Sequence, residues 1–277
     1  MALKGLIAAL PPPPPGRRGW PWTEQTDPAL FATAPAGGWP RISIVCPSFR
    51  QGRFIEETIR SVLLQNYPAL EFIVMDGGSQ DETAAMLQQY SPWLTHWESQ
   101  PDRGQSHALN KGFARATGAL HGWINSDDYY LPGAFAAIAG AYRPGRRALY
   151  FGDWLERIGD EPALTLHRER SCFAFQVAAG GRTLPSHATF WPAAVHQPFN
   201  EALRFTLDAE FFKRLTDGGI KPRHIPQPLG VFRQHAAAKS STIVDVAQAE
   251  TAAWSRAQPW HIHWLWRLSR LLDRFHP

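Results

Sequence analysis

The stretch ISIVCPSFRQGRFIEETIRSVLLQNYPALEFIVMD, residues 42–76, decides the fold. Its first apolar run, Ile42–Cys46, predicts a buried strand, and apolar residues at helical spacing in the segment 54–65 predict the helix that follows. The run Leu70–Asp76 predicts a second strand, and the segment 81–90 predicts a second helix. The chain therefore starts its folded part with two strand–helix units.

The same alternation continues towards the C-terminus. Further strands are expected at 95–99, 119–124 and 149–154, and further helices at 106–118, 131–143 and 207–219. Strands that alternate with helices of this length predict an α/β fold with a mostly parallel central sheet and helices on both faces. Such a sheet binds ligands at the carboxyl ends of its strands.

Composition divides the chain into three parts. We expect a proline-rich, extended and flexible arm over residues 1–40, a folded domain over 41–240, and a C-terminal tail over 241–277. From Trp260 onward the tail has the pattern of an amphipathic basic helix, which would either pack on the domain or a partner, or lie on a membrane surface.

Charge, cysteine content and hydropathy limit the class of protein. A net charge of +4 favours a surface that tolerates anionic ligands over a nucleic-acid groove. Two cysteines are too few for a disulfide framework, and the apolar run near residue 1 is shorter than a secretory signal. No apolar stretch is long enough for a transmembrane helix. We therefore expect a cytoplasmic protein whose membrane contact, if it has any, is peripheral, at the inner face.

Carboxylates follow two of the predicted strands. Asp76 begins the loop DGGSQDET after the second strand, and Asp127 and Asp128 end the segment NSDD after the fourth. Gly77 permits a close approach of backbone to ligand, although Asp76 would equally suit an ordinary turn before a helix. The adjacent aspartates fit either a solvated surface turn or a Mg²⁺ or Mn²⁺ ion that carries a nucleoside diphosphate. Neither a P-loop nor a dinucleotide fingerprint is present.

The order of these motifs resembles one family. The runs SIVCPSFRQGRFIEETIRSVLLQNYPALEFIVMDGGSQDET and QPDRGQSHALNKGFARATGALHGWINSDDYYLPGAF are similar to the opening of family 2 glycosyltransferases. The likeness is strong over residues 41–140 and weak over 185–240. It implies a glycosyltransferase domain over 41–240, in which residues 41–140 bind the nucleotide-sugar and residues 141–240 bind the acceptor. It implies the GT-A fold, a Rossmann-like sheet, with a nucleotide-diphospho-sugar donor, usually a UDP-sugar, a divalent metal (Mn²⁺ or Mg²⁺) and inversion at the transferred sugar.

The resemblance also implies roles for residues of the donor side. Residues beside the nucleotide base or bordering the donor would be Pro47, Ser48, Phe49, Asp76, Gly77, Asp102, Asn110 and Lys111, with Asp76 binding the base. Asp128 is the first choice as metal ligand, with Asp127 before it contributing to the metal and donor site. Asn125 stands where a strict DxD motif has its first Asp.

The second half would supply the base and the acceptor contacts. Asp208, in TLDAEFFKRL, matches the family's general base, with Glu210 in reserve. His235 would contact the metal or a phosphate, because Arg233 and Lys239 nearby favour an anion. His187 and His235 lie where related enzymes approach the acceptor or the diphosphate, and Trp191 could stack on a sugar face, although a histidine or tryptophan is more often structural.

The sequence therefore predicts a glycosyltransferase that moves a sugar from a nucleoside diphosphate donor to an acceptor hydroxyl. The absence of a QxxRW motif and of membrane spans argues against a processive polysaccharide synthase. The family suggests the assembly of cell-envelope, capsule or exopolysaccharide glycans, with a glycan or a lipid-linked glycan as acceptor and no nucleic acid. Two other classes stay open: a non-catalytic nucleotide- or sugar-binding module, and a sugar nucleotidyltransferase, although the glycine-rich basic loop of the latter is missing.

Overall fold

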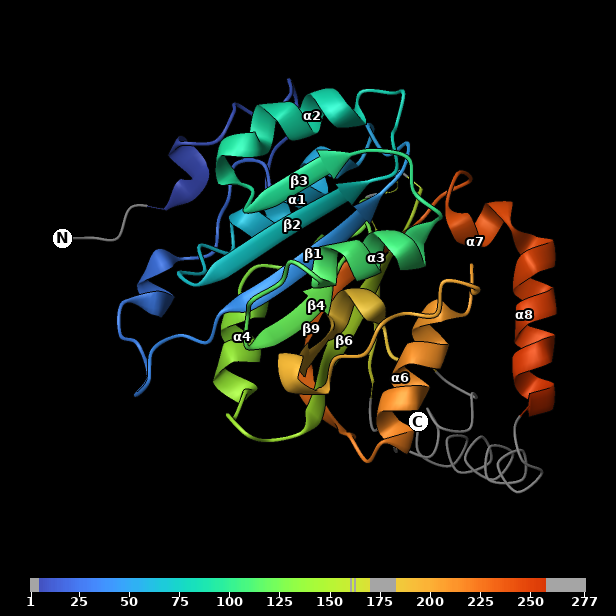
Figure 1. The fold of residues 1–277 in the computed structure, drawn as a ribbon. Helices are drawn as coiled ribbons and strands as arrows, with labels where there is room; N and C mark the ends of the chain where they lie inside the picture. Colours follow the sequence, from blue (N-terminus) through green and yellow to red (C-terminus); the bar gives the residue numbers. More distant parts are fainter. Residues whose placement is uncertain (1–4, 160, 162, 170–182, 258–277) are drawn as a thin grey trace.

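One curled sheet organises the chain in the computed structural model, which describes residues 5–159, 161, 163–169 and 183–257 (Figure 1). The strands follow the order β3-β2-β1-β4-β8-β6-β9-β5, and β7 pairs with β6. The strands are β1 (Ile42–Ser48), β2 (Leu70–Asp76), β3 (His96–Ser99), β4 (Leu120–Trp123), β5 (Tyr129–Tyr130), β6 (Ala148–Ile158), β7 (Leu164–His167), β8 (Thr189–Pro192) and β9 (Lys221–Gln234). The α-helices are α1 (Ile55–Leu63), α2 (Thr83–Tyr90), α3 (Gln105–Phe113), α4 (Ala134–Ala141), α6 (Leu207–Asp217), α7 (Lys239–Thr242) and α8 (Val244–Ala257).

The first half of the sheet is parallel throughout. β1 pairs with β2 and β4, and β2 pairs with β3, all in parallel register. The register sets Ser48 opposite Asp76 and Asp76 opposite Ser99, so the carboxyl ends of three strands meet in one row. The strands and helices expected over residues 42–143 are all present, and the mostly parallel sheet is confirmed.

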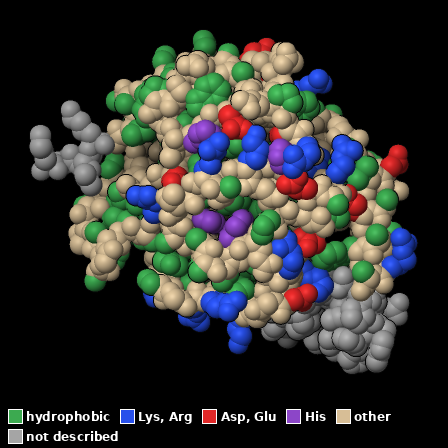
Figure 2. Space-filling model, viewed as in Figure 1, with side chains coloured by type: hydrophobic (Ala, Val, Ile, Leu, Met, Phe, Trp, Pro, Cys, Tyr) green, Lys and Arg blue, Asp and Glu red, His purple; other side chains and the backbone are tan. Residues whose placement is uncertain are grey.

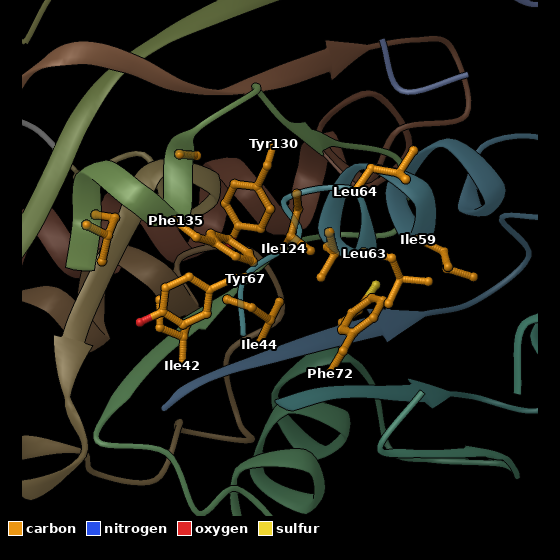
Figure 3. Packing of buried hydrophobic residues seen from close by; sticks show 14 of the residues in the cluster. Ile42, Ile44, Ile59, Leu63, Leu64, Tyr67, Phe72, Ile124, Tyr130 and Phe135 are labelled. Carbon is orange, nitrogen blue, oxygen red and sulfur yellow. The ribbon is translucent and has the colours of Figure 1, made fainter. Parts of the chain in front are cut away.

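Helices cover both faces of this sheet, as the sequence predicts. On one face, the residues Ile42 and Ile44 of β1 pack with α1 and α4 in a cluster of buried apolar side chains that includes Phe72, Tyr130 and Phe135 (Figure 3). On the other face, α3 and α6 pack against β1 and β4 in a second cluster rich in aromatic rings. Burial of these two apolar layers is the main driving force that holds the helices on the sheet.

The second half mixes directions and contains a strand that the sequence does not reveal. β8 runs antiparallel to β4 and β6, whereas the long β9 runs parallel to β6. Proline removes a ladder donor, so the prolines of KPRHIPQPLG argue against a strand. The structure accommodates two of them because the register shifts between Gly152 and Trp154, where the pairing skips from Ile225 to Pro228.

The segment before residue 41, expected to be an extended arm, packs on the domain from residue 5 onward. Leu10, Trp22 and Phe31 are buried. The guanidinium of Arg60 on α1 is also fully buried, and it donates hydrogen bonds to the carbonyl oxygens of Pro11, Pro21 and Trp22 and to the hydroxyl of Tyr90. The N-terminal segment packs on the domain because its large apolar side chains are buried there and because Arg60 binds its carbonyl oxygens.

Among the described residues, no helix is both long and apolar enough to cross a membrane. The amphipathic helix expected from Trp260 onward lies outside the described residues.

Candidate active site

The carboxyl edge of the parallel strands holds Asp76, whose carboxylate accepts three hydrogen bonds and keeps one acceptor site on Oδ1. The backbone N–H of Ser79 donates to Asp76 Oδ2 at 2.9 Å, and the Ser79 hydroxyl donates to Oδ1 at 2.6 Å. The hydroxyl of Ser99, on the neighbouring strand β3, donates to Oδ2 at 2.6 Å. These contacts fix the orientation of the carboxylate at the end of β2.

The loop after β2 closes against the loops after β1 and β3. A Cβ atom added to Gly77 would lie 3.0 Å from Oδ2 of Asp102 and 3.2 Å from Cδ2 of Phe49, so any larger residue here would have to displace these two side chains. The Phe49 ring is 54% exposed at the end of β1. Behind it, the buried Ser48 hydroxyl has no hydrogen-bond partner among the described residues. The structure thus brings together Ser48, Phe49, Gly77 and Asp102, with Pro47 preceding them in β1.

Two residues of α3 that were predicted to border the nucleotide-sugar make contacts with other parts of the protein. The amide of Asn110 donates to the carbonyl oxygen of Phe199 at 3.0 Å and accepts from the N–H of Phe199 at 2.7 Å. Lys111 forms an ion pair with Glu98 of β3, to which Arg115 also contributes. Figure 2 shows such acidic and basic side chains side by side on the face where β3 and α3 lie. In this structure Asn110 therefore holds the segment around residue 199, and Lys111 pairs with the neighbouring strand.

Asp127 and His235 face each other across the two halves. Oδ2 of Asp127, in the turn after β4, lies 3.1 Å from Nε2 of His235, which follows β9. Both side chains keep some contact with solvent. The ring of Phe54 packs on the imidazole, with 4.5 Å between ring centroids, and fixes its position.

Asp128 lies behind this pair and is 1% exposed. Its Oδ1 accepts from the backbone N–H of Arg233 at 2.9 Å, and its Oδ2 accepts from the side-chain amide of Asn125 at 3.3 Å. Burial, reinforced by the neighbouring charge of Asp127, raises the pKa of Asp128 well above its ordinary value, and the two hydrogen bonds oppose this rise. Asp128 is thus oriented by the protein, while Asp127 is the more accessible carboxylate.

The cation Arg233 is occupied within the protein. Its guanidinium donates to Oε2 of Glu57 at 2.8 Å and lies over the rings of Phe54 and Tyr129. Burial at 3% exposure leaves it no free face for a phosphate. Of the two cations that the sequence places beside His235, Lys239 is therefore the one directed towards the site.

Lys239 connects the end of the chain to the turn after β4. Its ammonium donates to Oε1 of Gln105, the first residue of α3. Nε2 of Gln105 donates to Oδ1 of Asn125 at 2.7 Å, and Asn125 in turn donates to Asp128. Burial lowers the pKa of Lys239 to about 8, and the negative charge of Asp208 is the largest effect opposing this. No local pattern in the sequence identifies Gln105, because its partners are distant in the chain.

Asp208 is the second residue of α6 and its carboxylate carries few protein contacts. Oδ1 accepts the N–H of Ala209 at 2.8 Å. Burial raises the pKa of Asp208 above its ordinary value, although the hydrogen bond from Ala209 and the charge of Lys239 both lower it. The reserve candidate Glu210 is instead held by Arg214, through contacts of 2.8 and 3.0 Å. Of these two carboxylates, Asp208 is the one that no arginine or lysine holds in a direct ion pair in the described part of the chain, which suits it to accept a proton.

The N-terminal end of α6 is held by a residue that the sequence analysis did not identify. Glu250 of α8 accepts hydrogen bonds from the backbone N–H groups of Arg204, Phe205 and Thr206 at 2.8 to 2.9 Å, and one from the Thr206 hydroxyl at 3.0 Å. In Figure 1, α8 lies beyond α6 at the edge of the molecule. A carboxylate from one helix thus satisfies the free N–H groups that lead into another.

Asp127 offers a carboxylate oxygen to a divalent cation. In this structure Oδ2 of Asp127 and Nε2 of His235 share a hydrogen bond of 3.1 Å. Two neighbouring ligands on an octahedral Mg²⁺ with bonds of about 2.1 Å lie about 3.0 Å apart, so a cation that replaced the shared proton would bind both atoms with little movement. Within the described part of the chain, no group of three or more His, Cys, Asp or Glu side chains could hold a metal ion. A metal here would take few protein ligands and complete its shell with water and phosphate oxygens, as Mg²⁺ commonly does.

The two candidates for acceptor contact lie inside the protein. Trp191 is fully buried among the rings of Trp123, Phe113 and Phe211, which leaves no face for a sugar. His187 is 4% exposed, and burial lowers its pKa to about 3. Both side chains have the structural role that is usual for their residue types.

Comparison with known proteins identifies relatives of this chain. The sequence model of the family described as "Glycosyl transferase family 2" matches residues 43–212. An uncharacterized glycosyltransferase of Mycobacterium tuberculosis is 30% identical over 162 residues, which are 56% of this chain and 60% of the relative. TuaG of Bacillus subtilis, a putative teichuronic acid biosynthesis glycosyltransferase, is 35% identical over 94 residues, 32% of this chain and 36% of the relative. The chain thus spans less than two thirds of the length of these relatives.

Two solved structures resemble the fold. TarS of S. aureus, residues 1–349 in complex with UDP-GlcNAc, superposes with a TM-score of 0.62 at 15% identity, over 73% of this chain and 61% of that chain. The mannosyltransferase PcManGT of Pyrobaculum calidifontis, in complex with GDP-Man and Mn²⁺, gives a TM-score of 0.55 at 17% identity, over 89% of this chain and 84% of that chain. At such identities the likeness concerns the fold alone, and it confirms the GT-A architecture.

Proposed function

The chain belongs to glycosyl transferase family 2, and from this premise we propose that it transfers a sugar from a nucleoside diphosphate donor to an acceptor hydroxyl with inversion. The observation that carries the proposal is the meeting of Asp127, His235 and Asp208 around the carboxyl edge of a GT-A sheet. Asp127 and His235 lie 3.1 Å apart, and the charges of Asp208 and Asp127 both act on Lys239. Ligands of an open α/β sheet bind at this edge.

The donor nucleotide would lie over the ends of β1, β2 and β3. The exposed ring of Phe49 offers a stacking surface for a base, and Asp76 at the end of β2 offers carboxylate oxygens for a base N–H. Gly77 and Asp102 border the same loop. UDP is the proposed nucleotide, and the complex of the structural neighbour TarS with UDP-GlcNAc supports it.

We assign the divalent metal to Asp127 and His235, with Asp128 behind them. A bound Mn²⁺ or Mg²⁺ would stabilise the negative charge of the leaving diphosphate. Asp127 offers an accessible carboxylate oxygen and His235 a ring nitrogen, while the hydrogen bonds to Asp128 keep the turn in place. The complex of PcManGT with GDP-Man and Mn²⁺ supports this assignment.

Asp208 is the proposed general base. It accepts the proton of the acceptor hydroxyl, whose oxygen bonds to the anomeric carbon while the bond from that carbon to the diphosphate oxygen breaks. The diphosphate leaves with the bonding electron pair, and a single displacement of this kind inverts the anomeric centre. The raised pKa of Asp208 suits this role, because a base is most effective when its pKa approaches the working pH.

The acceptor is a glycan or a lipid-linked glycan of the cell envelope under this proposal. The similarity to TuaG, a putative teichuronic acid biosynthesis glycosyltransferase, supports an envelope glycan over other acceptors.

Nucleotide binding, measured by thermal shift and calorimetry, tests the donor and the metal together. Each of UDP, GDP, dTDP, CDP and ADP is added with and without Mn²⁺, since a ligand that binds only the folded state raises apparent stability. We expect a Mn²⁺-dependent shift with UDP that exceeds the shifts with the other nucleotides. In Asp127→Asn, the Mn²⁺-dependent part of UDP affinity should fall at least 10-fold.

Asp245→Asn is the matched control, because Asp245 is an exposed aspartate on α8. It should bind UDP and Mn²⁺ like the wild type. A UDP affinity that does not respond to Mn²⁺, or that survives in Asp127→Asn, would overturn the metal assignment. No shift with any nucleotide would overturn the donor assignment.

A further inference from the structure

Four polar side chains form a continuous hydrogen-bonded chain across the candidate active site, which we call the polar relay: Lys239, Gln105, Asn125 and Asp128. Lys239 begins α7, Gln105 begins α3, and Asn125 and Asp128 belong to the turn after β4. The distances are 2.7 Å from Gln105 to Asn125 and 3.3 Å from Asn125 to Asp128, and the Lys239 ammonium contacts Gln105 directly. Three separate segments are thus joined through side chains alone.

The direction of the polar relay is determined by the chemistry of its ends. An ammonium only donates, so Gln105 must present its carbonyl oxygen to Lys239 and its NH₂ group to Asn125. Asn125 then presents its carbonyl oxygen to Gln105 and its NH₂ group to Asp128, which accepts. Every contact of the polar relay pairs a donor with an acceptor in this one direction, and such networks orient their members strongly.

This direction explains why an asparagine suits position 125. An ionised aspartate has no N–H or O–H to donate and would leave Oδ2 of Asp128 without its partner. It would also add a third carboxylate beside Asp127 and Asp128, where like charges already oppose ionisation. Asn125, the residue that departs from a strict DxD motif, is therefore the one that links Gln105 to Asp128.

The two ends of the polar relay belong to the segments that present the proposed metal ligands. Asp127 lies between Asn125 and Asp128, and His235 lies four residues before Lys239. The turn that leads into α7 connects His235 to Lys239, with the backbone N–H of Ala238 donating to the carbonyl oxygen of His235 at 2.9 Å. A brace between Lys239 and Asp128 therefore limits how far Asp127 and His235 can separate when a cation replaces the proton of their direct hydrogen bond.

We propose that Gln105, Asn125 and Lys239 are positioning residues that hold Asp127 and His235 at the spacing that a divalent cation requires. The proposal rests on the proposed function, since it takes these two residues as the metal pair. The family match ends at residue 212, so Lys239 extends the site with a segment outside that match. Side chains behind metal ligands commonly act in this way, and their loss typically lowers metal affinity or activity by about 10- to 100-fold.

The decisive variant is Gln105→Met, which keeps most of the side-chain volume and removes both hydrogen bonds. Mn²⁺ binding in the presence of UDP is measured from the electron paramagnetic resonance signal of free Mn²⁺, a readout independent of turnover. We expect the Mn²⁺ dissociation constant to rise by about 10-fold or more, because outer partners of metal ligands contribute on this scale. Gln88→Met, at an exposed position of α2, is the matched control and should leave the constant unchanged.

A double-mutant cycle distinguishes a relay from local effects at Gln105. Lys239→Met should weaken Mn²⁺ binding to a similar extent, and the combination with Gln105→Met should add little, since both break the same chain of contacts. Additive losses would overturn the relay, as would a Mn²⁺ constant in Gln105→Met equal to that of the wild type. A loss of thermal stability in Gln105→Met without a change in Mn²⁺ affinity would also overturn it, because the residue would then only support the fold.

Asp127→Asn separates failure of the polar relay from failure of the metal assignment. If Asp127→Asn binds Mn²⁺ like the wild type, the metal pair itself is wrong and the relay has no such ligand to position. If Asp127→Asn loses Mn²⁺ while Gln105→Met retains it, the metal pair stands and the relay is overturned.

Discussion

The donor half and the second half of this protein hold their site residues by different means. In the donor half, parallel pairing sets Ser48, Asp76 and Ser99 in one row, so their alignment follows from the register of β1, β2 and β3. In the second half, the backbone that leads into Asp208 is held by one carboxylate, that of Glu250. Glu250 lies on α8, a helix whose residues are all at least partly exposed. The first arrangement depends on packing of the core, and the second on a few polar contacts.

This difference predicts which substitutions change the fold and which change the chemistry. Replacing polar side chains of the second half should cost little stability but much turnover. Substitutions that disturb the close packing of the donor half should cost much stability and less turnover. Three substitutions test this division.

The largest effect is expected for Asp208→Asn. The amide cannot accept the acceptor's proton, and a general base typically contributes a factor of 10² to 10⁴, so turnover should fall by about 10³-fold. UDP affinity and melting temperature should stay close to wild type, because the amide keeps the carbonyl oxygen that accepts from Ala209. Steady-state kinetics and calorimetry check the two halves of this expectation. A turnover within a factor of about three of the wild type would assign the base elsewhere.

The pH profile gives an independent check on Asp208. Burial raises its pKa above the usual aspartate value, and the base is active only when ionised. As pH falls, wild-type turnover should therefore begin to decline at a pH above the ordinary pKa of aspartate. The residual rate of Asp208→Asn should lack this decline.

Much of the donor half is predictable from local sequence, and the reason is physical. Short, mostly apolar runs such as Ile42–Cys46 and Leu70–Asp76, separated by helical patterns, predict buried parallel strands. Acids that follow such strands gather at the carboxyl edge of the sheet. Asp76, Asp127 and Asp128 were found in this way. Their individual roles at the site stay predictions.

The contacts of the second half could not be predicted, because they join residues far apart in the chain. Lys239 reaches Gln105 across 134 positions and Glu250 reaches Thr206 across 44, without a pattern at either end. The prolines of β9 argued against a strand there, but the strand tolerates them through a shift in its register with β6. Aromatic residues such as Trp22 within the proline-rich segment were the available sign that it packs on the domain.

The second substitution, Gly112→Ala, tests the packing of the donor half. A Cβ atom on Gly112 of α3 would lie 2.4 Å from Cγ1 of Val45, a fully buried residue of β1. The helix must move outward, and overpacking of this kind costs about 2 kcal/mol of unfolding free energy. Gly140→Ala on α4 is the control, because nothing lies within 4 Å of its added Cβ, and alanine favours a helix. Chemical denaturation should separate the two variants, and equal stabilities would refute close packing of α3 on β1.

The smallest effect on stability is expected for Glu250→Gln, which removes the charge that accepts the N–H groups before α6. Loss of a capping interaction costs about 1 kcal/mol, and displacement of the turn before Asp208 should lower turnover more than it lowers stability. Burial alone would raise the pKa of Glu250, but the hydrogen bonds from Thr206, Arg204 and Phe205 outweigh it and lower the pKa.

A glutamate with a lowered pKa in the folded state contributes stability that is complete above its unfolded pKa, about 4.3, and is lost as pH falls through the folded value. The stability difference between wild type and Glu250→Gln should therefore be constant near neutral pH and shrink below about pH 4. Glu24→Gln, an exposed glutamate of the N-terminal segment, should show neither the loss nor the pH dependence. If Glu250→Gln retained wild-type turnover together with its stability, α8 would not hold the base-bearing helix, and the second half would owe its geometry to core packing, as the donor half does.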